Sequence, residues 1–202
     1  QYTESDVIHL NGNTMMINGL DTLSCDSMVY WSKLDSGFAM GNVRYIQSKH
    51  NRLLTTDMFH YWQTNGYRGS SFISNGYTKI IELDKLISAN KIKYNDKSQI
   101  MKLSQNAVVK NINRSIGGDI IEIHYTDSLI EQIKVDNSAF AYNNIKLKTS
   151  NNYINKKFRD EMSSNQLIAY FDNDTIYQLK LIDMASTLYH VIDEDLLAGI
   201  NE

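Results

Sequence analysis

The sequence predicts an all-β protein built from stacked repeats of about 30 residues. Three observations predict it: a strand-like phrase recurs along the chain, apolar and polar residues alternate between its copies, and turn-forming residues separate the runs. The 202 residues include no proline. A chain of mostly paired strands would contain little proline, because proline lacks the amide donor of a β-ladder. Biased codon usage would also explain the lack of proline.

The recurring phrase reads apolar, any residue, small, Asp or Asn, any residue, apolar, any residue, Tyr. Its copies lie at 23–30, 54–61 and 87–94, with a looser copy at 116–123 and a degenerate one at 162–170. The Asp or Asn positions are separated by steps of 31, 33, 29 and 46 residues; they are Asp26, Asp57, Asn90, Asp119 and Asn165.

The apolar residues of each copy change parity around its Asp or Asn. They stand three positions before it and two and four positions after it, so a straight strand would place them on opposite faces. A bend or bulge after the small residue would return them to one face. We therefore interpret the Asp and Asn residues as corner formers, bonded to their local backbone, rather than as catalytic groups.

Alternating runs at 43–47, 79–83, 108–112 and 145–148 supply the strands between the copies. A second phrase precedes or opens these runs, and we expect it to mark the turn into each return strand: Gly41-Asn42-Val43, Asn75-Gly76-Tyr77, Asn106-Ala107-Val108 and Asn137-Ser138-Ala139. The long last step predicts a loop insertion or an extra hairpin within 143–161. Residues 156–162 and 193–197 would suit either a single helical turn or a loop.

Composition excludes several classes of protein. The 20 Lys and Arg against 23 Asp and Glu leave a formal net charge of −3, which argues against a nucleic-acid partner. The single cysteine, Cys25, excludes an intrachain disulfide and falls at the small position of the first copy, so we expect it to be buried. The five histidines show no metal-binding spacing, and no catalytic motif stands out. We therefore expect no metal, no cofactor and no catalytic residue.

No apolar run approaches the roughly 20 residues that a membrane-spanning helix needs. A signal peptide is not visible either. Because the chain opens with Gln1, we expect a mature form or a fragment of a longer repeat protein.

Together these phrases resemble the OstA-like family, the repeat domain of LptA-like periplasmic lipopolysaccharide-transport proteins and of the outer-membrane translocon's N-terminal domain. The family signature is a GNV turn followed by an apolar-x-small-Asp-x-x-x-Tyr strand, which Gly41-Asn42-Val43 and 54–61 match. Residues 167–177, 184–191 and 197–201 resemble the long variants of the family. The chain departs from the pattern at Asn90, Asn165, the 46-residue step and Asp183-Met184-Ala185.

The resemblance implies one domain over 1–202, an open antiparallel β-jellyroll (β-taco) with a V-shaped apolar groove. It implies a non-enzymatic carrier that moves lipopolysaccharide across the periplasm of a Gram-negative cell to the outer membrane, with the lipid A acyl chains in the groove. The expected partners are lipopolysaccharide and other β-jellyroll domains, or copies of this chain, joined end to end through edge strands.

The repeat register supplies the residues that we expect to line the groove. They are Leu23, Met28, Tyr30, Val43, Leu54, Phe59, Tyr61, Ile87, Ile92, Tyr94, Val108, Ile116, Ile121 and Ile123. The same residues would also suit a closed core, in which a charge at Phe59 or Ile92 would unfold the protein.

The residues alone leave two other functions open. One is a β-solenoid module for glycan binding, adhesion or scaffolding, with Trp31, Trp62 and the tyrosines as a stacking platform. The other is a polysaccharide-degrading enzyme, for which scattered acids such as Asp35, Glu82 and Asp127 would have to pair. An apolar trough favours the carrier, exposed aromatic rings favour the glycan module, and clustered acids and bases favour the enzyme.

Overall fold

The computed structural model describes residues 6–48, 51–63, 70–127, 129–146, 157–173, 175–193 and 196–201. A short 3-10 turn, η2 (Ser32–Leu34), joins two of its strands. The strands in the described part are β1 (Val7–Asn18), β2 (Asp21–Trp31), β3 (Ser36–Gln47), β4 (Arg52–Gln63), β5 (Ser70–Glu82), β6 (Lys85–Asn95), β7 (Ile100–Lys110), β8 (Arg114–Thr126), β9 (Leu129–Lys146), β10 (Lys157–Asp172), β11 (Thr175–Ile182), β12 (Ser186–Asp193) and β13 (Leu196–Asn201).

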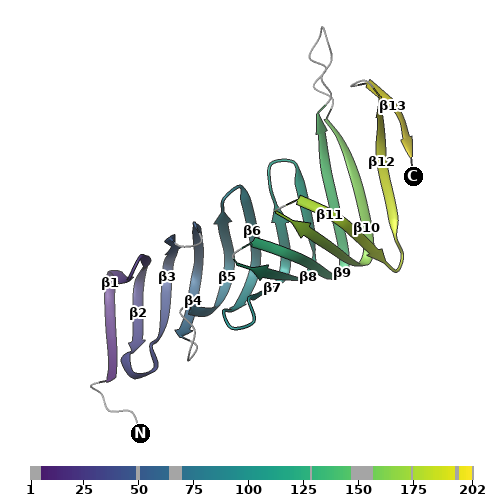
Figure 1. Ribbon diagram of the computed structural model, residues 1–202. Coiled ribbons are helices and arrows are strands. Elements are labelled where there is room, and N and C mark those ends of the chain that lie inside the picture. Colours follow the sequence, from purple (N-terminus) through teal and green to yellow (C-terminus); the bar gives the residue numbers. More distant parts are fainter. Residues whose placement is uncertain are drawn as a thin grey trace.

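The strands form one antiparallel sheet in chain order. Each strand from β1 to β10 pairs with its neighbours in sequence, β10 then pairs with both β11 and β12, and β12 pairs with β13. Figure 1 shows the strands side by side from β1 at one end to β13 at the other. The two end strands do not meet, so the sheet stays open. This confirms the predicted all-β fold class, an open jellyroll-like sheet.

A line of bulges crosses the sheet at mid-strand, and we call it the crease. On one set of strands it consists of residues in the left-handed backbone region: Gly12-Asn13, Gly41-Asn42, Gly76, Gln105-Asn106, Asn137-Ser138 and, between β11 and β12, Asp183-Met184. The register of every neighbouring pair from β1 to β10 shifts at this line, opposite Asp26, Asp57, Asn90, Asp119 or Asn165.

The crease restores one buried face, as the parity switch predicted. In β4, Thr56 and Phe59 are buried, whereas Asp57 and Met58 between them are exposed. Two consecutive outward residues reverse the alternation, so the apolar positions before and after them share a face. The prediction that each Asp or Asn stands at a corner is confirmed, and Asp57 faces solvent there.

The second phrase does not form hairpin turns, contrary to our expectation. Gly41-Asn42 lies inside β3, and Asn137-Ser138 lies inside β9. Both sequences favour positive φ, which a bulge can require as well as a two-residue turn. The β1–β2 hairpin instead turns at Gly19-Leu20, where Asn18 pairs with Asp21.

Two aspartate corners, Asp26 and Asp57, pack against the bulge of the next strand. A Cβ on Gly41 would collide with the side chain of Asp26, and one on Gly76 would collide with Asp57. The amide of Asn42 donates to Asp26 Oδ2 at 2.9 Å. This hydrogen bond of the Asp26 side chain therefore joins two strands, rather than closing on the local backbone as we expected.

The long last step extends an existing hairpin. Strands β9 and β10 are 18 and 16 residues long and stay paired out to Lys146 and Lys157. Residues 147–156 of the expected insertion lie outside the described part of the chain. From Lys157 onward the alternative of a helical turn is wrong, because this segment is strand. Asp193 ends β12 and Leu196 begins β13, and 194–195 lie outside the described residues.

The crease divides the sheet into two walls that face each other across one apolar core. Wall A comprises 14–18, 21–25, 43–47, 52–56, 78–82, 85–89, 107–110, 114–118, 139–146, 157–164 and β12. Wall B comprises 7–11, 27–31, 36–40, 58–63, 70–75, 91–95, 100–104, 120–126, 129–136, 166–172 and β11. We call the space between them the interior, and the side opposite the crease the mouth.

Candidate functional site

The interior contains nearly all of the predicted groove residues. Twelve of the fourteen are buried, with none more than 6% exposed: Leu23, Met28, Val43, Leu54, Phe59, Tyr61, Ile87, Ile92, Tyr94, Ile116, Ile121 and Ile123. They belong to a single cluster of buried apolar side chains. The repeat register therefore located the inner face of the folded sheet.

Two predicted residues differ from the rest. Tyr30 is half-buried and packs at the margin of the core. Val108 is only partly buried, while Ala107 and Val109 on either side of it are buried. The bulge of β7 lies at Gln105-Asn106, one position earlier than the phrase suggested, so Ala107 takes the place that Val43 has in β3.

Small side chains face inward along the crease, where the walls converge. The buried residues beside the bulges are Thr14, Cys25, Val43, Thr56, Thr78, Ala89, Ala107, Ala139 and Ser164. Their hydroxyls bond one another and nearby carbonyls: Thr56 Oγ1 lies 2.9 Å from Thr78 Oγ1 and donates to the Asn75 carbonyl at 3.1 Å. These bonds satisfy polar groups where the regular ladder is interrupted. Burial also raises the pKa of the Cys25 thiol.

A row of aromatic rings fills the middle of the interior. Ring centroids are 5.2 Å apart from Tyr45 to Phe59, 5.2 Å from Phe59 to Phe72, 5.5 Å from Phe72 to Tyr94 and 6.4 Å from Tyr94 to Tyr125. Tyr45 belongs to wall A and the other four belong to wall B. The contact between Tyr45 and Phe59 therefore joins the walls directly.

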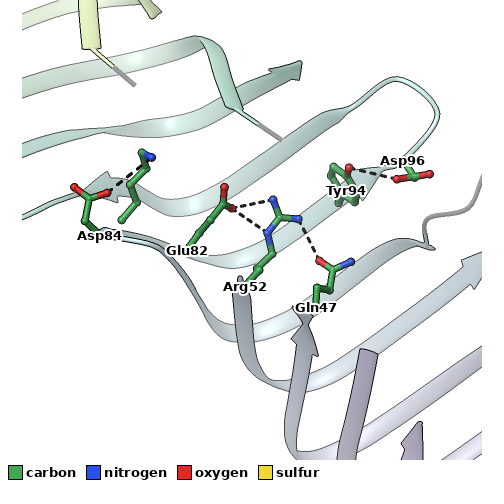
Figure 2. Close-up of polar contacts among 7 residues, drawn as sticks. Gln47, Arg52, Glu82, Asp84, Tyr94 and Asp96 are labelled. Carbon is green, nitrogen blue, oxygen red and sulfur yellow. Dashed lines mark hydrogen bonds and ion pairs between the residues drawn. The ribbon is translucent and has the colours of Figure 1, made fainter. Parts of the chain in front are cut away.

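Polar side chains close the mouth over this row. Figure 2 shows Arg52 between Glu82 and Gln47: its Nε donates to Glu82 Oε2 at 2.9 Å and its Nη1 to Gln47 Oε1 at 3.2 Å. The guanidinium also lies 5.5 and 5.3 Å from the ring centroids of Tyr94 and Tyr125 on the facing wall. We call these five residues the latch, because they join wall A to wall B.

The latch is buried despite its charge. The side chains of Arg52 and Glu82 are 3% and 5% exposed, and two carboxylate-to-guanidinium contacts together with the cation–π contacts offset part of the desolvation. Burial raises the pKa of Tyr94 to about 12 and raises that of Tyr125 above its usual range. Among the described residues, the Tyr125 hydroxyl has no hydrogen-bond partner.

Sequence reasoning missed the latch, although a signal was present. Gln47 is in phase with Val43 and Tyr45, just as Arg52 is with Leu54 and Glu82 with Ile80, and all of these are buried. Strict alternation outward from the crease would have placed the three polar residues on the inner face.

The interior is filled near the N-terminal strands and opens toward the C-terminal ones. Cavities of about 20 and 50 Å³ lie between the walls beside Leu23 and beside Val109. A pocket of about 280 Å³ lies farther along, lined on wall A by Ile116 and Met162 and on wall B by Ile176. A single water needs only about 10–15 Å³ by this kind of measure, so the last pocket has room for an apolar guest.

No further strand of the described part of the chain covers the N-terminal end of the interior. Ile8 pairs with Tyr30 and Leu10 with Met28, which places both on the inner face of β1. They are nevertheless 45% and 36% exposed. The core is therefore exposed at an unpaired strand edge.

The described residues give little support to other chemistry. They contain no group of three or more His, Cys, Asp or Glu that could hold a metal ion, and none of their helices could cross a membrane. His60 lies 3.2 Å from Ser36 Oγ, and burial lowers its pKa. Trp31 and Trp62 are half-buried, and Trp62 packs against the His60 ring at 5.3 Å.

Comparison with models of known protein families finds no match, and no curated protein is significantly similar to this chain. Inference about its function therefore rests on its residues and their geometry.

Proposed function

We propose that this protein is a non-enzymatic carrier of lipopolysaccharide or a similar amphipathic lipid in the periplasm of a Gram-negative cell. The observation that supports it is a continuous apolar interior between two walls, which the strands connect at the crease and which otherwise meet through side-chain contacts. The acyl chains of lipid A would lie between the walls, and the saccharide would remain outside the mouth. Burial of each methylene would contribute about 0.8 kcal/mol.

The filled middle of the interior requires the walls to separate when lipid enters there. Phe59, Ile92 and Leu103 are 0% exposed in the ligand-free chain. Separation leaves the ladder of each wall intact, because the bonds across the mouth are side-chain contacts such as that between Tyr61 and Met16 at 3.1 Å. The crease would act as the hinge.

The two ends of the sheet support assembly in a row. β1 exposes both its unpaired edge and the inner-face side chains Ile8 and Leu10, and β13 is the other end of the strand order. Strand addition would cover them with a second copy of this chain or with another open β-jellyroll domain, and would join the interiors end to end.

A binding comparison tests the carrier function. The purified protein is titrated with lipid A and with the same saccharide lacking its acyl chains, while near-UV circular dichroism reports the fold. Saturable binding of lipid A alone is expected. Binding of the saccharide alone, or of neither, would sink the proposal.

A scaffold or glycan module is the second candidate, and the filled middle of the interior favours it. In that case the apolar residues would only stabilise the fold, and lipid A would not bind. The saccharide titration distinguishes a glycan module from a scaffold, because a glycan module binds the sugar and a scaffold binds neither compound.

A further inference from the structure

The C-terminal part of the mouth combines an apolar floor with a polar rim. On wall A, Ile116 of β8 pairs with Ala141 of β9, which pairs with Met162 of β10. Ile176 and Leu179 of β11 face them from wall B and line the same pocket of about 280 Å³. All five are apolar, and they come from four strands.

A polar line runs beside this floor, two residues nearer the mouth. Arg114 pairs with Asn143, and Asn143 pairs with Asp160; all three line the pocket. Because residues two apart share a face of a strand, the polar line and the apolar floor belong to one surface. A guest therefore meets charge at the rim and hydrocarbon below it.

The rim is predominantly cationic. The smaller cavity of about 50 Å³ shares Arg114, Ile116 and Ile176 with the pocket and adds Lys85 and Lys110 to its lining. Lys110 and Arg114 are exposed and form no ion pair within the described part of the chain, whereas Lys85 lies 3.9 Å from Asp84.

One carboxylate, that of Asp160, also lines the pocket. His190 contacts this carboxylate through two of its nitrogen atoms. The His190 backbone N–H donates to Asp160 Oδ1 at 2.9 Å, and its Nδ1 lies 3.2 Å from the same oxygen. Asp160 stands two strands away from Arg114 along the rim. An anionic group would therefore be attracted to the side of the rim formed by Lys110 and Arg114.

We propose that this pocket is a binding site for an acyl chain that carries an anionic headgroup. The chain would lie against Ile116, Ile176 and Leu179, and the headgroup would contact Lys110 and Arg114. This inference rests on the proposed carrier function and adds where the lipid first binds, since this part of the interior is already open while the middle is closed by the latch. A carboxylate and a phosphate monoester share the required charge.

The experiment locates the guest and measures the effect of the rim. Spin-labelled stearate is added to methyl-labelled protein, and we expect selective broadening of the Ile116, Ile176 and Leu179 methyl signals. Affinities are then measured for stearate, for a lysophospholipid with a phosphate monoester and for neutral monoacylglycerol. Whichever anionic lipid binds more tightly identifies the headgroup, and the neutral lipid should bind less tightly than either.

Charge reversal supplies the matched variants. Lys110→Glu with Arg114→Glu is expected to weaken binding of the anionic lipids about tenfold, or roughly 1.4 kcal/mol. Arg44→Glu with Lys93→Glu is the control, because both residues are exposed, lie outside the pocket and form no ion pair with another described residue. Ile176→Trp, at a half-buried position, should obstruct the floor without altering the rim.

Two outcomes would contradict the proposed binding site. Equal weakening by both charge reversals would show only a general electrostatic effect, and broadening confined to Ile8 and Leu10 would place the guest at the N-terminal end. Either result leaves the carrier function standing, provided that lipid A still binds. Failure of the wild-type protein to bind every lipid, including lipid A, would overturn both proposals.

Discussion

At Gly41 the absence of a side chain allows β2 and β3 to pack closely at the crease. Its φ is +73°, and the Asp26 side chain occupies the space that a Cβ would need. Gly12 has a similar φ of +79° but nothing within 4 Å. The two glycines therefore separate the cost of an unfavourable backbone conformation from the cost of a steric collision.

Gly41→Ala is expected to lower the free energy of unfolding by about 2–4 kcal/mol, and Gly12→Ala by only about 1 kcal/mol. The difference arises because both substitutions strain the backbone and only the first displaces Asp26. Urea unfolding of both variants checks this. Equal losses would contradict the packing of Asp26 on Gly41.

The latch makes a second prediction at the residue scale. Arg52→Met should destabilise the protein by about 3–5 kcal/mol, because it leaves the Glu82 carboxylate buried and unpaired. The double variant Arg52→Met with Glu82→Leu should recover a large part of that loss. A double-mutant cycle by urea unfolding measures the coupling. Additive losses would show that the buried pair does not act as a unit.

At the scale of elements, the crease is most pronounced at the C-terminal end, where it falls between two separate strands rather than within one. β11 and β12 both pair with β10, and Asp183, Met184 and Ala185 separate them. Met184 has φ +50° and is 85% exposed, so it holds a strained conformation without any buried contact to offset it. Each of the other bulges contains a Gly or an Asn at positive φ, whereas Asp183-Met184 contains neither.

Met184→Gly is therefore expected to stabilise the protein by about 0.5–1 kcal/mol, because glycine adopts positive φ without steric cost. The control is Ile112→Gly, which is also highly exposed, at 79%, but has no positive φ, and should destabilise slightly through unfolded-chain entropy. Thermal unfolding compares them. A loss of stability in Met184→Gly would mean that the side chain makes a contact that matters.

The same elements show what the sequence could and could not predict. Parity around Asp57 and Asn90 predicted the bend, and the repeat register predicted which residues face inward, because both depend on local alternation. The exact position of the bulge before Val108 could not be predicted, because the segment has one Asn, Asn106, and no Gly to indicate whether Gln105 or Ala107 shares the positive φ. The latch also went unpredicted, because a partner on the facing wall depends on how the sheet folds over.

Over the whole molecule, the buried tyrosines predict a loss of stability in alkali. Burial raises the pKa of Tyr94 to about 12 and that of Tyr61 and Tyr125 further, whereas an unfolded tyrosine ionises near about 10. Above pH 10 the unfolded chain releases protons that the folded chain keeps. The stabilisation is therefore complete below about pH 10 and is lost as the pH rises toward 12 and beyond.

Urea midpoints measured across this range, together with tyrosinate absorbance, check the prediction. Tyr94→Phe should reduce the slope of stability against pH because it removes one of the three groups. An unchanged slope in that variant, or ionisation of all tyrosines before unfolding, would contradict the burial of Tyr94.

The alternation at the crease also limits how such a chain can change in length. Left-handed bulges lie on β1, β3, β5, β7 and β9, and the acidic or amide corners lie on the strands between them. Insertion or loss of one strand would set two bulges, or two corners, side by side. Duplications and deletions are therefore compatible with this architecture only in pairs of strands. Related proteins should differ in length by whole hairpins and keep the alternation of bulge and corner strands.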